Sequence, residues 1–182
     1  MTLLVLVGPA GVGKGTVVRE ILEKNTDFML SVSATTRSAR PQEEDGIHYH
    51  FVSKETFEGL IKTGQLLEWA QVHGQHYYGT PLAELDKAER LGRHLVLEID
   101  LQGARQIRTR VDNAVSVFLL PPSIQELEDR LRGRGTETEE QIQTRLETAR
   151  IELAAASEFD FQVVNDDLVE AASTIVDLVR KH

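Results

Sequence analysis

The most constraining feature of this chain is a glycine-rich stretch that directly follows a short apolar run. Residues 3–7 read LLVLV, and residues 8–16 read GPAGVGKGT. The apolar run that ends in glycine predicts a buried strand, and the amphipathic segment 13–25 predicts a helix. The pattern G-x-x-x-x-G-K-[ST] between a strand and a helix is typical of a loop that binds phosphate groups through backbone N–H groups.

One position of this loop departs from the usual pattern. Gly15 stands where a hydroxyl is expected, and Thr16 offers its hydroxyl one residue later. Backbone N–H groups need no side chain, so we expect the phosphate cradle to be intact and Lys14 to follow the transferring group as a cation. The expected nucleotide phosphate-binding residues are Gly8, Pro9, Ala10, Gly11, Val12, Gly13, Lys14, Gly15 and Thr16.

Composition narrows the class of protein. The chain has 182 residues, 41% of them hydrophobic, no cysteine and a formal net charge of −9. These values predict one globular domain that does not coat nucleic acid, and the missing cysteines suit a reducing cytoplasm. We expect no signal peptide, because the N-terminus lacks a basic start and a cleavage site, and no membrane span.

Strands alternate with helices along most of the chain. Continuous apolar or alternating runs predict strands at 28–34, 48–52, 94–100, 114–120 and 161–165. Periodicity predicts helices at 54–64, 82–92 and 168–182, the second capped by Thr80 with Pro81 at its first position. Capping boxes at Ser123 and Thr138 predict two more helices. This alternation favours an α/β fold of three layers, with a mainly parallel core sheet and helices on both faces.

Two segments interrupt the alternation. Residues 33–80 are rich in turns and polar residues, which indicates an inserted lobe, and residues 123–150 form a charged helix–turn–helix that we interpret as a lid. The core is then 1–32, 81–122 and 151–182, all within one domain covering 1–182.

The inserted lobe carries candidate binding residues. The guanidinium groups of Arg37 and Arg40 could grip one phosphate from two sides, and Tyr49 could add a hydrogen bond. Glu68 and the adjacent Tyr77 and Tyr78 lie further along, in a polar segment. The alternatives are a solvated arginine pair on the surface and a surface carboxylate at position 68.

Charged residues of the core and of the lid are further candidates. Glu98 and Asp100 are two residues apart on the strand expected at 94–100, so both side chains should point to the same side at its carboxyl end. Of the lid arginines, Arg132 is interpreted as a surface ion-pair residue. Arg130, Arg134 and Arg145 are either part of a surface ion-pair array or able to close over phosphates.

Several segments together resemble guanylate kinase across nearly the whole chain. They read GPAGVGK, SVSATTRSARPQEEDGIHYHFV, LLEWAQVHGQHYYGT, LEIDLQGA, PPS, GRGTE and VND, in that order. The resemblance implies a P-loop fold with a GMP-binding lobe and a helical lid. It implies ATP-dependent phosphorylation of GMP, and of dGMP, by direct in-line transfer with Mg²⁺. We expect the protein to be cytoplasmic, and both a monomer and a homodimer stay open.

The resemblance also implies individual roles. The residues implied to bind GMP are Ser33, Arg37, Arg40, Tyr49, Glu68, Tyr78, Thr80 and Asp100. The residues implied to act in transfer are Lys14, Arg37, Arg134 and Arg145. We expect Thr16 and Asp100 to help hold Mg²⁺, through water. Residues Asn165 to Leu168 contact either the adenine or the loop beneath it, or else cap a helix.

The chain departs from the family pattern at three positions. Glu98 stands where the family usually has aspartate, and Ala10 and Gly15 stand where it usually has serine. Three alternative functions stay open: an adenylate kinase, whose loop also reads GKGT; a scaffold-type binding module; and a kinase for a phosphorylated sugar, which gives no reason for Glu68.

Overall fold

The centre of the molecule is a parallel sheet. The computed structural model describes residues 1–72, 75–133 and 138–182. In these ranges a five-stranded sheet has the order β2-β7-β1-β8-β9, and each neighbouring pair runs parallel. Its strands are β1 (Leu3–Val7), β2 (Phe28–Leu30), β7 (His94–Glu98), β8 (Ala114–Leu120) and β9 (Phe161–Val164). The fully buried run LLVLV is the middle strand, as its apolar composition predicts.

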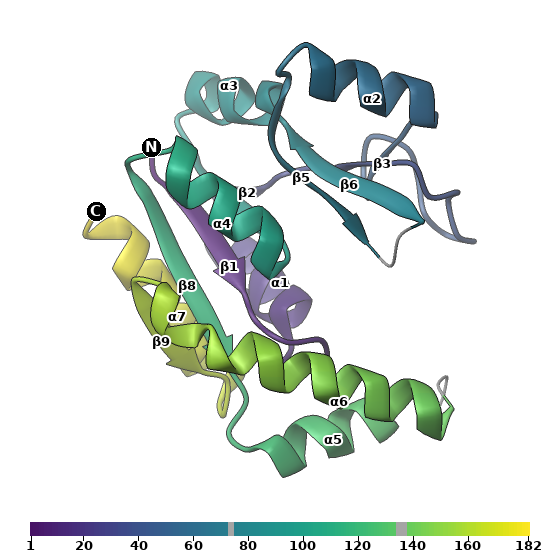
Figure 1. Cartoon of the computed structure of the whole chain (residues 1–182). Coiled ribbons are helices and arrows are strands. Elements are labelled where there is room, and N and C mark those ends of the chain that lie inside the picture. The colour runs from purple at the N-terminus through teal and green to yellow at the C-terminus, as the bar shows by residue number, and fades with distance from the viewer. Residues whose placement is uncertain (73–74, 134–137) are drawn as a thin grey trace.

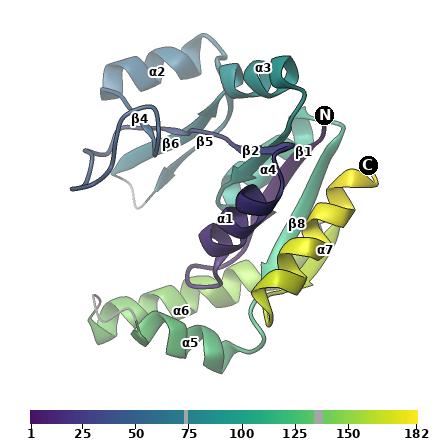
Figure 2. The same ribbon diagram turned by 180° about the vertical axis from the view of Figure 1, so that it is seen from behind.

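Helices cover both faces of this sheet (Figure 1; Figure 2). Successive residues of β1 point to opposite faces, so Leu4 and Leu6 pack in one apolar cluster while Leu3, Val5 and Val7 pack in the other. The outer helices are α1 (Lys14–Lys24) and α7 (Leu168–Arg180) on the first face, and α3 (Leu82–Leu91) and α4 (Leu101–Arg110) on the second. The prediction of a three-layer α/β fold is confirmed.

A second, smaller sheet lies in the inserted segment, residues 33–80, which we call the lobe. It has the order β4-β3-β6-β5 and leaves β5 at an edge. Phe57, which is fully buried, packs with Ala34 and Leu66 in a separate apolar cluster. The elements of the lobe are β3 (Ala34–Thr35), β4 (His50–Phe51), α2 (Lys54–Lys62), β5 (Leu66–Val72) and β6 (His76–Pro81).

The predicted lid contains the helices α5 (Ile124–Gly133) and α6 (Glu139–Ala154), which extend away from the core beside each other (Figure 1; Figure 2). The predicted capping box of Thr138 and Gln141 begins α6. After α6 a short 3-10 turn, η1 (Ala156–Glu158), leads to β9. Within the described ranges, no helix combines the length and apolar character that a membrane span requires.

Three local predictions are wrong. The strand expected at 28–34 is two strands, β2 in the core sheet and β3 in the lobe sheet. The other two predictions concern residues near the site. Thr80 is not a helix cap, because β6 continues through it and pairs it with Glu68, while Pro81 caps α3. Asp100 does not lie on a strand. Strand β7 ends at Glu98, and Asp100 instead caps α4, accepting a hydrogen bond from the backbone N–H of Gly103 at 2.7 Å. Helix α4 itself was not predicted.

Candidate active site

The glycine loop is held in shape by its backbone and by the end of β9. Gly13 caps α1 with φ of 99°, a left-handed conformation that favours glycine. A Cβ at this position would lie 2.6 Å from Nδ2 of Asn165, which donates to the carbonyl of Val12 at 2.8 Å. Asp167 accepts from two backbone N–H groups and caps α7. The segment that begins at Asn165 therefore both contacts the loop and caps a helix.

Two basic side chains lie against this loop. Nζ of Lys14 donates to the carbonyls of Gly8, at 2.5 Å, and Pro9, at 3.3 Å. Arg130 of α5 donates to the carbonyls of Val12 and Asn165, each at 3.2 Å. Arg130 thus joins α5 to the loop and to the end of β9, which is a structural role that the sequence alone did not indicate.

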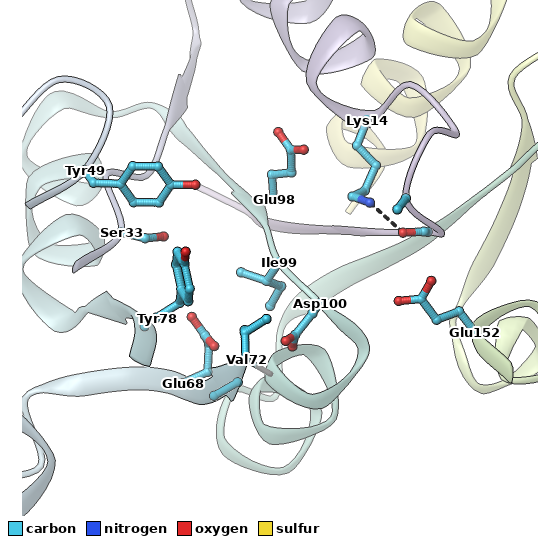
Figure 3. A pocket seen from close by; sticks show the side chains of 14 residues that line it. Lys14, Ser33, Tyr49, Glu68, Val72, Tyr78, Glu98, Ile99, Asp100 and Glu152 are labelled. Carbon is cyan, nitrogen blue, oxygen red and sulfur yellow. Dashed lines mark hydrogen bonds between the residues drawn. The ribbon is translucent and has the colours of Figure 1, made fainter. Parts of the chain in front are cut away.

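Two cavities adjoin at the loop. The first, of about 380 Å³, is lined by residues of the lobe, the core and α6. The second, of about 410 Å³, lies over residues 9–16. Ala10, Lys14 and Glu98 line both. In Figure 3, Ser33 and Tyr49 lie on one side of the first cavity, and Lys14 and Glu152 lie on the other. The arrangement offers two neighbouring sites that share one cationic side chain.

Glu68 is a buried carboxylate in the wall of the first cavity. Glu68 is 3% exposed, and its Oε1 accepts a hydrogen bond from Oγ1 of Thr80 at 2.7 Å. Burial, with a smaller contribution from the charge of Asp100, raises the pKa of Glu68 to about 7. The side chain therefore changes protonation state near neutral pH.

Arg37 is held by an ordered set of partners. Its Nη1 and Nη2 donate to the two carboxylate oxygens of Glu43 at 2.8 and 2.9 Å, and its Nε donates to the hydroxyl of Tyr78 at 3.1 Å. The guanidinium carbon lies 5.4 Å from the ring centroid of Tyr49. Arg37 lowers the pKa of the Glu43 carboxyl to about 2. The arrangement places a fixed cation behind two tyrosines of the first cavity.

Most of the residues predicted to bind the acceptor come together. Ser33, Tyr49, Glu68, Tyr78 and Asp100 line the first cavity. Thr80 is fully buried and donates its hydroxyl to Glu68, so it lies behind the cavity wall. Arg40 is exposed, and its backbone N–H donates to Glu43 at 2.7 Å. Their roles toward a ligand stay predictions.

The lid arginines differ from one another. Arg132 forms ion pairs with Glu128 and Glu139 on the surface, as predicted. Arg145 is half-buried on α6. Arg134 lies outside the described residues.

Two carboxylates of the site were not given a firm role from the sequence. Glu152 of α6 lines the first cavity, and burial raises the pKa of its carboxyl. It lies seven residues after Arg145, hence two turns further along the same helix face, and this spacing could have indicated it.

Glu98 is the second of these carboxylates. A Cβ on Gly15 would lie 3.6 Å from its Oε2, and both residues line the second cavity with Thr16. Asp100 lines only the first cavity. The Glu98 carboxylate therefore lies beside the position of the missing loop hydroxyl, and Thr16 lines the same cavity.

Comparisons with known proteins agree with this geometry. The family model described as guanylate kinase matches residues 1–182. A guanylate kinase of Leifsonia xyli subsp. xyli is 54% identical over 177 residues, covering 97% of this chain and 70% of that protein. One of Thermosynechococcus vestitus is 54% identical over 166 residues, covering 91% and 86%.

A solved structure is similar as well. The crystal structure of guanylate kinase from Anaplasma phagocytophilum superposes with a TM-score of 0.78 at 33% identity, covering 99% of this chain and 85% of that one. The fold, the loop and the family match thus point the same way, and the chain belongs to the guanylate kinase family.

Proposed function

We propose that this chain transfers the γ-phosphoryl group of ATP directly to the phosphate of GMP, giving ADP and GDP. The observation that supports this most is the pair of adjoining cavities that share Lys14. One lies over the phosphate loop, where ATP phosphates fit. The other has a buried carboxylate in its wall, beside tyrosines and an arginine. dGMP is proposed as a second acceptor, because the assigned side chains address the base and the phosphate.

Glu68 is proposed to select guanine. Guanine presents N1–H and an exocyclic amine side by side, and an ionised carboxylate accepts from both. Adenine presents a lone pair at N1, which would face the oxygens of Glu68 and leave a buried polar group unpaired. Discrimination of this kind reaches about 10⁴. Thr80 fixes the carboxylate from behind through its 2.7 Å hydrogen bond.

The acceptor phosphate is assigned to Arg37, Arg40, Tyr49 and Tyr78. Four of the five N–H groups of Arg37 already have partners, because Nη1 also donates to the carbonyl of Ser38 at 2.7 Å. A phosphate therefore takes the remaining N–H or replaces Glu43. Both routes keep the guanidinium beside the tyrosines.

Transfer itself needs alignment and charge stabilisation rather than a covalent intermediate. An oxygen of the GMP phosphate attacks the γ-phosphorus in line, the bond to the β-γ bridging oxygen breaks, and ADP leaves with that electron pair. Lys14 would stabilise the charge on the transferring group. Arg134 and Arg145 are proposed to approach from the lid and to exclude water.

Mg²⁺ is the implied cofactor, and the residues of the second cavity fit it. Mg²⁺ prefers oxygen ligands and keeps several waters, and when bound it would neutralise charge on the ATP phosphates. Thr16 and Glu98 supply oxygens there, and Gly15 leaves room for the longer Glu98 side chain. We propose that Glu98 offsets the loop hydroxyl that Gly15 lacks. Asp100, predicted to join Thr16, is proposed to act on the acceptor side.

A coupled ADP-release assay with GMP, dGMP, AMP and UMP, with and without Mg²⁺, tests the proposal. We expect GMP and dGMP to be phosphorylated and AMP and UMP to react at least about 10³-fold more slowly. A preference for AMP would instead indicate an adenylate kinase. If calorimetry detected no binding of ATP or GMP, the binding-module alternative would replace an enzymatic role.

A further inference from the structure

Strand β5, which carries Glu68, lies at the edge of the lobe sheet. A side chain of α4 forms hydrogen bonds with the backbone groups of β5 at this edge. Gln106 accepts a hydrogen bond from the backbone N–H of Trp69 through Oε1 at 3.3 Å, and it donates from Nε2 to the carbonyl of Trp69 at 2.6 Å. A carboxamide has the donor and acceptor of a peptide group. Gln106 therefore takes the place of a neighbouring strand at this one residue.

The backbone on the other side of Glu68 is also tied to α4. Nη1 of Arg110 donates to the carbonyl of Leu67 at 3.0 Å. On the inner side of β5, Glu68 pairs with Thr80, and the register shifts between Leu66 and Glu68. Such an irregularity re-aims side chains, so the direction of the Glu68 carboxylate depends on what holds the strand at this point.

The same helix leaves the space that the carboxylate occupies. A Cβ on Gly103, one turn before Gln106, would lie 2.4 Å from Oε2 of Glu68. Helix α4 thus fixes the backbone after Glu68 and admits its carboxylate at the same time. These two features come from Gly103 and Gln106, 35 and 38 positions after Glu68 in the sequence, and they act on the Glu68 side chain and on the backbone of the next residue.

We propose that Gln106 is a positioning residue for base recognition, which acts by clamping the Trp69 backbone so that Glu68 faces the guanine edge. This inference rests on the proposed function. Gln106 does not line the first cavity, so we expect it to act through Glu68 rather than by contacting the substrate. It determines how well the enzyme distinguishes GMP from IMP, whose base lacks the exocyclic amine that Glu68 recognises.

Gln106→Met tests the proposal, because it removes both hydrogen bonds and keeps the side-chain length. We expect the ratio of kcat/KM for GMP over IMP to fall about 10-fold, in line with the loss of one hydrogen bond between Glu68 and the exocyclic amine, and the KM for ATP to stay within about 2-fold. Gly103→Ala is the second variant. It displaces the carboxylate from the other side and should lower the same ratio without touching Gln106.

A double-mutant cycle with Glu68→Gln separates positioning from a general structural effect. If Gln106 acts through Glu68, Gln106→Met should leave the ratio unchanged in the Glu68→Gln background. Gln162→Met is the matched control, since the Gln162 carboxamide also donates to two backbone carbonyls, at 3.0 and 2.9 Å, but far from the lobe. It should leave the ratio unchanged.

The outcomes are distinct. A ratio that does not change in folded Gln106→Met and Gly103→Ala proteins overturns the inference, as does an equal fall in the Glu68→Gln background. An unmodified enzyme that uses IMP as well as GMP would instead contradict the proposed recognition of guanine by Glu68.

Discussion

The phosphate loop and the lobe present two different ways to build a binding site. The loop offers backbone N–H groups whose directions are set by glycine conformations and by two side chains, Asn165 and Arg130. The lobe offers side chains, and two of them are held by another side chain: Thr80 holds Glu68, and Glu43 holds Arg37. Substitutions in the loop that preserve its backbone should therefore leave phosphate binding nearly unchanged. Substitutions of the binding side chains in the lobe should weaken binding of the acceptor.

Gly13→Ala should produce the largest effect, because it disturbs the backbone conformation of the loop. An alanine at φ of 99° is strained, and its Cβ would lie 2.6 Å from the Asn165 amide. We expect the affinity for ATP to fall at least about 100-fold, measured by calorimetry. Gly92→Ala is the matched control, since Gly92 has φ of 62° and open space around it. Gly92→Ala should lower the free energy of unfolding and leave the affinity for ATP unchanged. An equal fall in ATP affinity in both variants would contradict the comparison.

Arg37→Lys tests whether binding of GMP in the lobe depends on how the side chain of residue 37 is held. Lysine keeps the charge but loses the forked contact with Glu43 and the hydrogen bond to Tyr78. We expect the KM for GMP to rise about 10- to 100-fold while the KM for ATP is unchanged. Arg132→Lys, at a surface ion pair, should change neither value. A parallel rise in both KM values would show that the two regions are not independent.

The pH dependence of GMP binding should be the next largest effect. Burial raises the pKa of Glu68 from 4.5 to about 7, and only the ionised form accepts from guanine. The KM for GMP should therefore rise up to about 10-fold for each pH unit below 7, and binding should release protons near that pH. Glu68→Gln should flatten the profile.

The contribution of Glu68 to the stability of the fold changes with pH in the opposite direction to its contribution to GMP binding. Since the folded-state pKa of Glu68 lies above its ordinary value, its contribution to stability is present in full below about pH 4.5 and is lost as the pH rises through about 7.

A KM for GMP that is constant between pH 5.5 and 7 would contradict the predicted pH dependence of binding. It would show that Glu68 is already ionised or does not contact the base.

Side-chain changes at Gly15 of the loop and at Glu98, which lines the cavity beside it, should give the smallest effect. Gly15→Ser should lower the Mg²⁺ concentration needed for half-maximal MgATP binding by only a few-fold, and Glu98→Asp should raise it by a similar factor. If Glu98 offsets the missing hydroxyl, Glu98→Asp should have little effect once Gly15→Ser has restored that hydroxyl, so the double variant should match Gly15→Ser alone. Calorimetry without GMP measures this directly, and an equal effect of Glu98→Asp in both backgrounds would contradict the pairing of Gly15 with Glu98.

The fold was predictable where burial decides the structure. Strands β1, β7, β8 and β9 are apolar runs, and the glycine that ends α3 adopts the left-handed conformation expected of a stop. Helix α4 was missed because its segment LQGARQIRTR contains a glycine and few apolar residues. Its stability comes from the Asp100 cap and from the packing of Ala104 and Ile107, which the sequence shows only weakly.

Several residues that line the first cavity were predictable from the sequence, but their arrangement was not. The arginines, tyrosines and Glu68 stood out by residue type in a polar segment. Local sequence did not indicate that Thr80 would continue a strand, since its pairing with Glu68 is a long-range contact. The same holds for Gln106 and Arg130, whose partners lie 37 and 118 positions away. Long-range hydrogen bonds leave no periodic pattern in the chain.

The wall common to the two cavities limits how the enzyme could be redesigned. Ala10, Lys14 and Glu98 line both cavities, so we expect a substitution there to alter both cavities together. Attempts to switch the preferred base should begin instead with side chains that border a single compartment, such as Ser33 and Glu68.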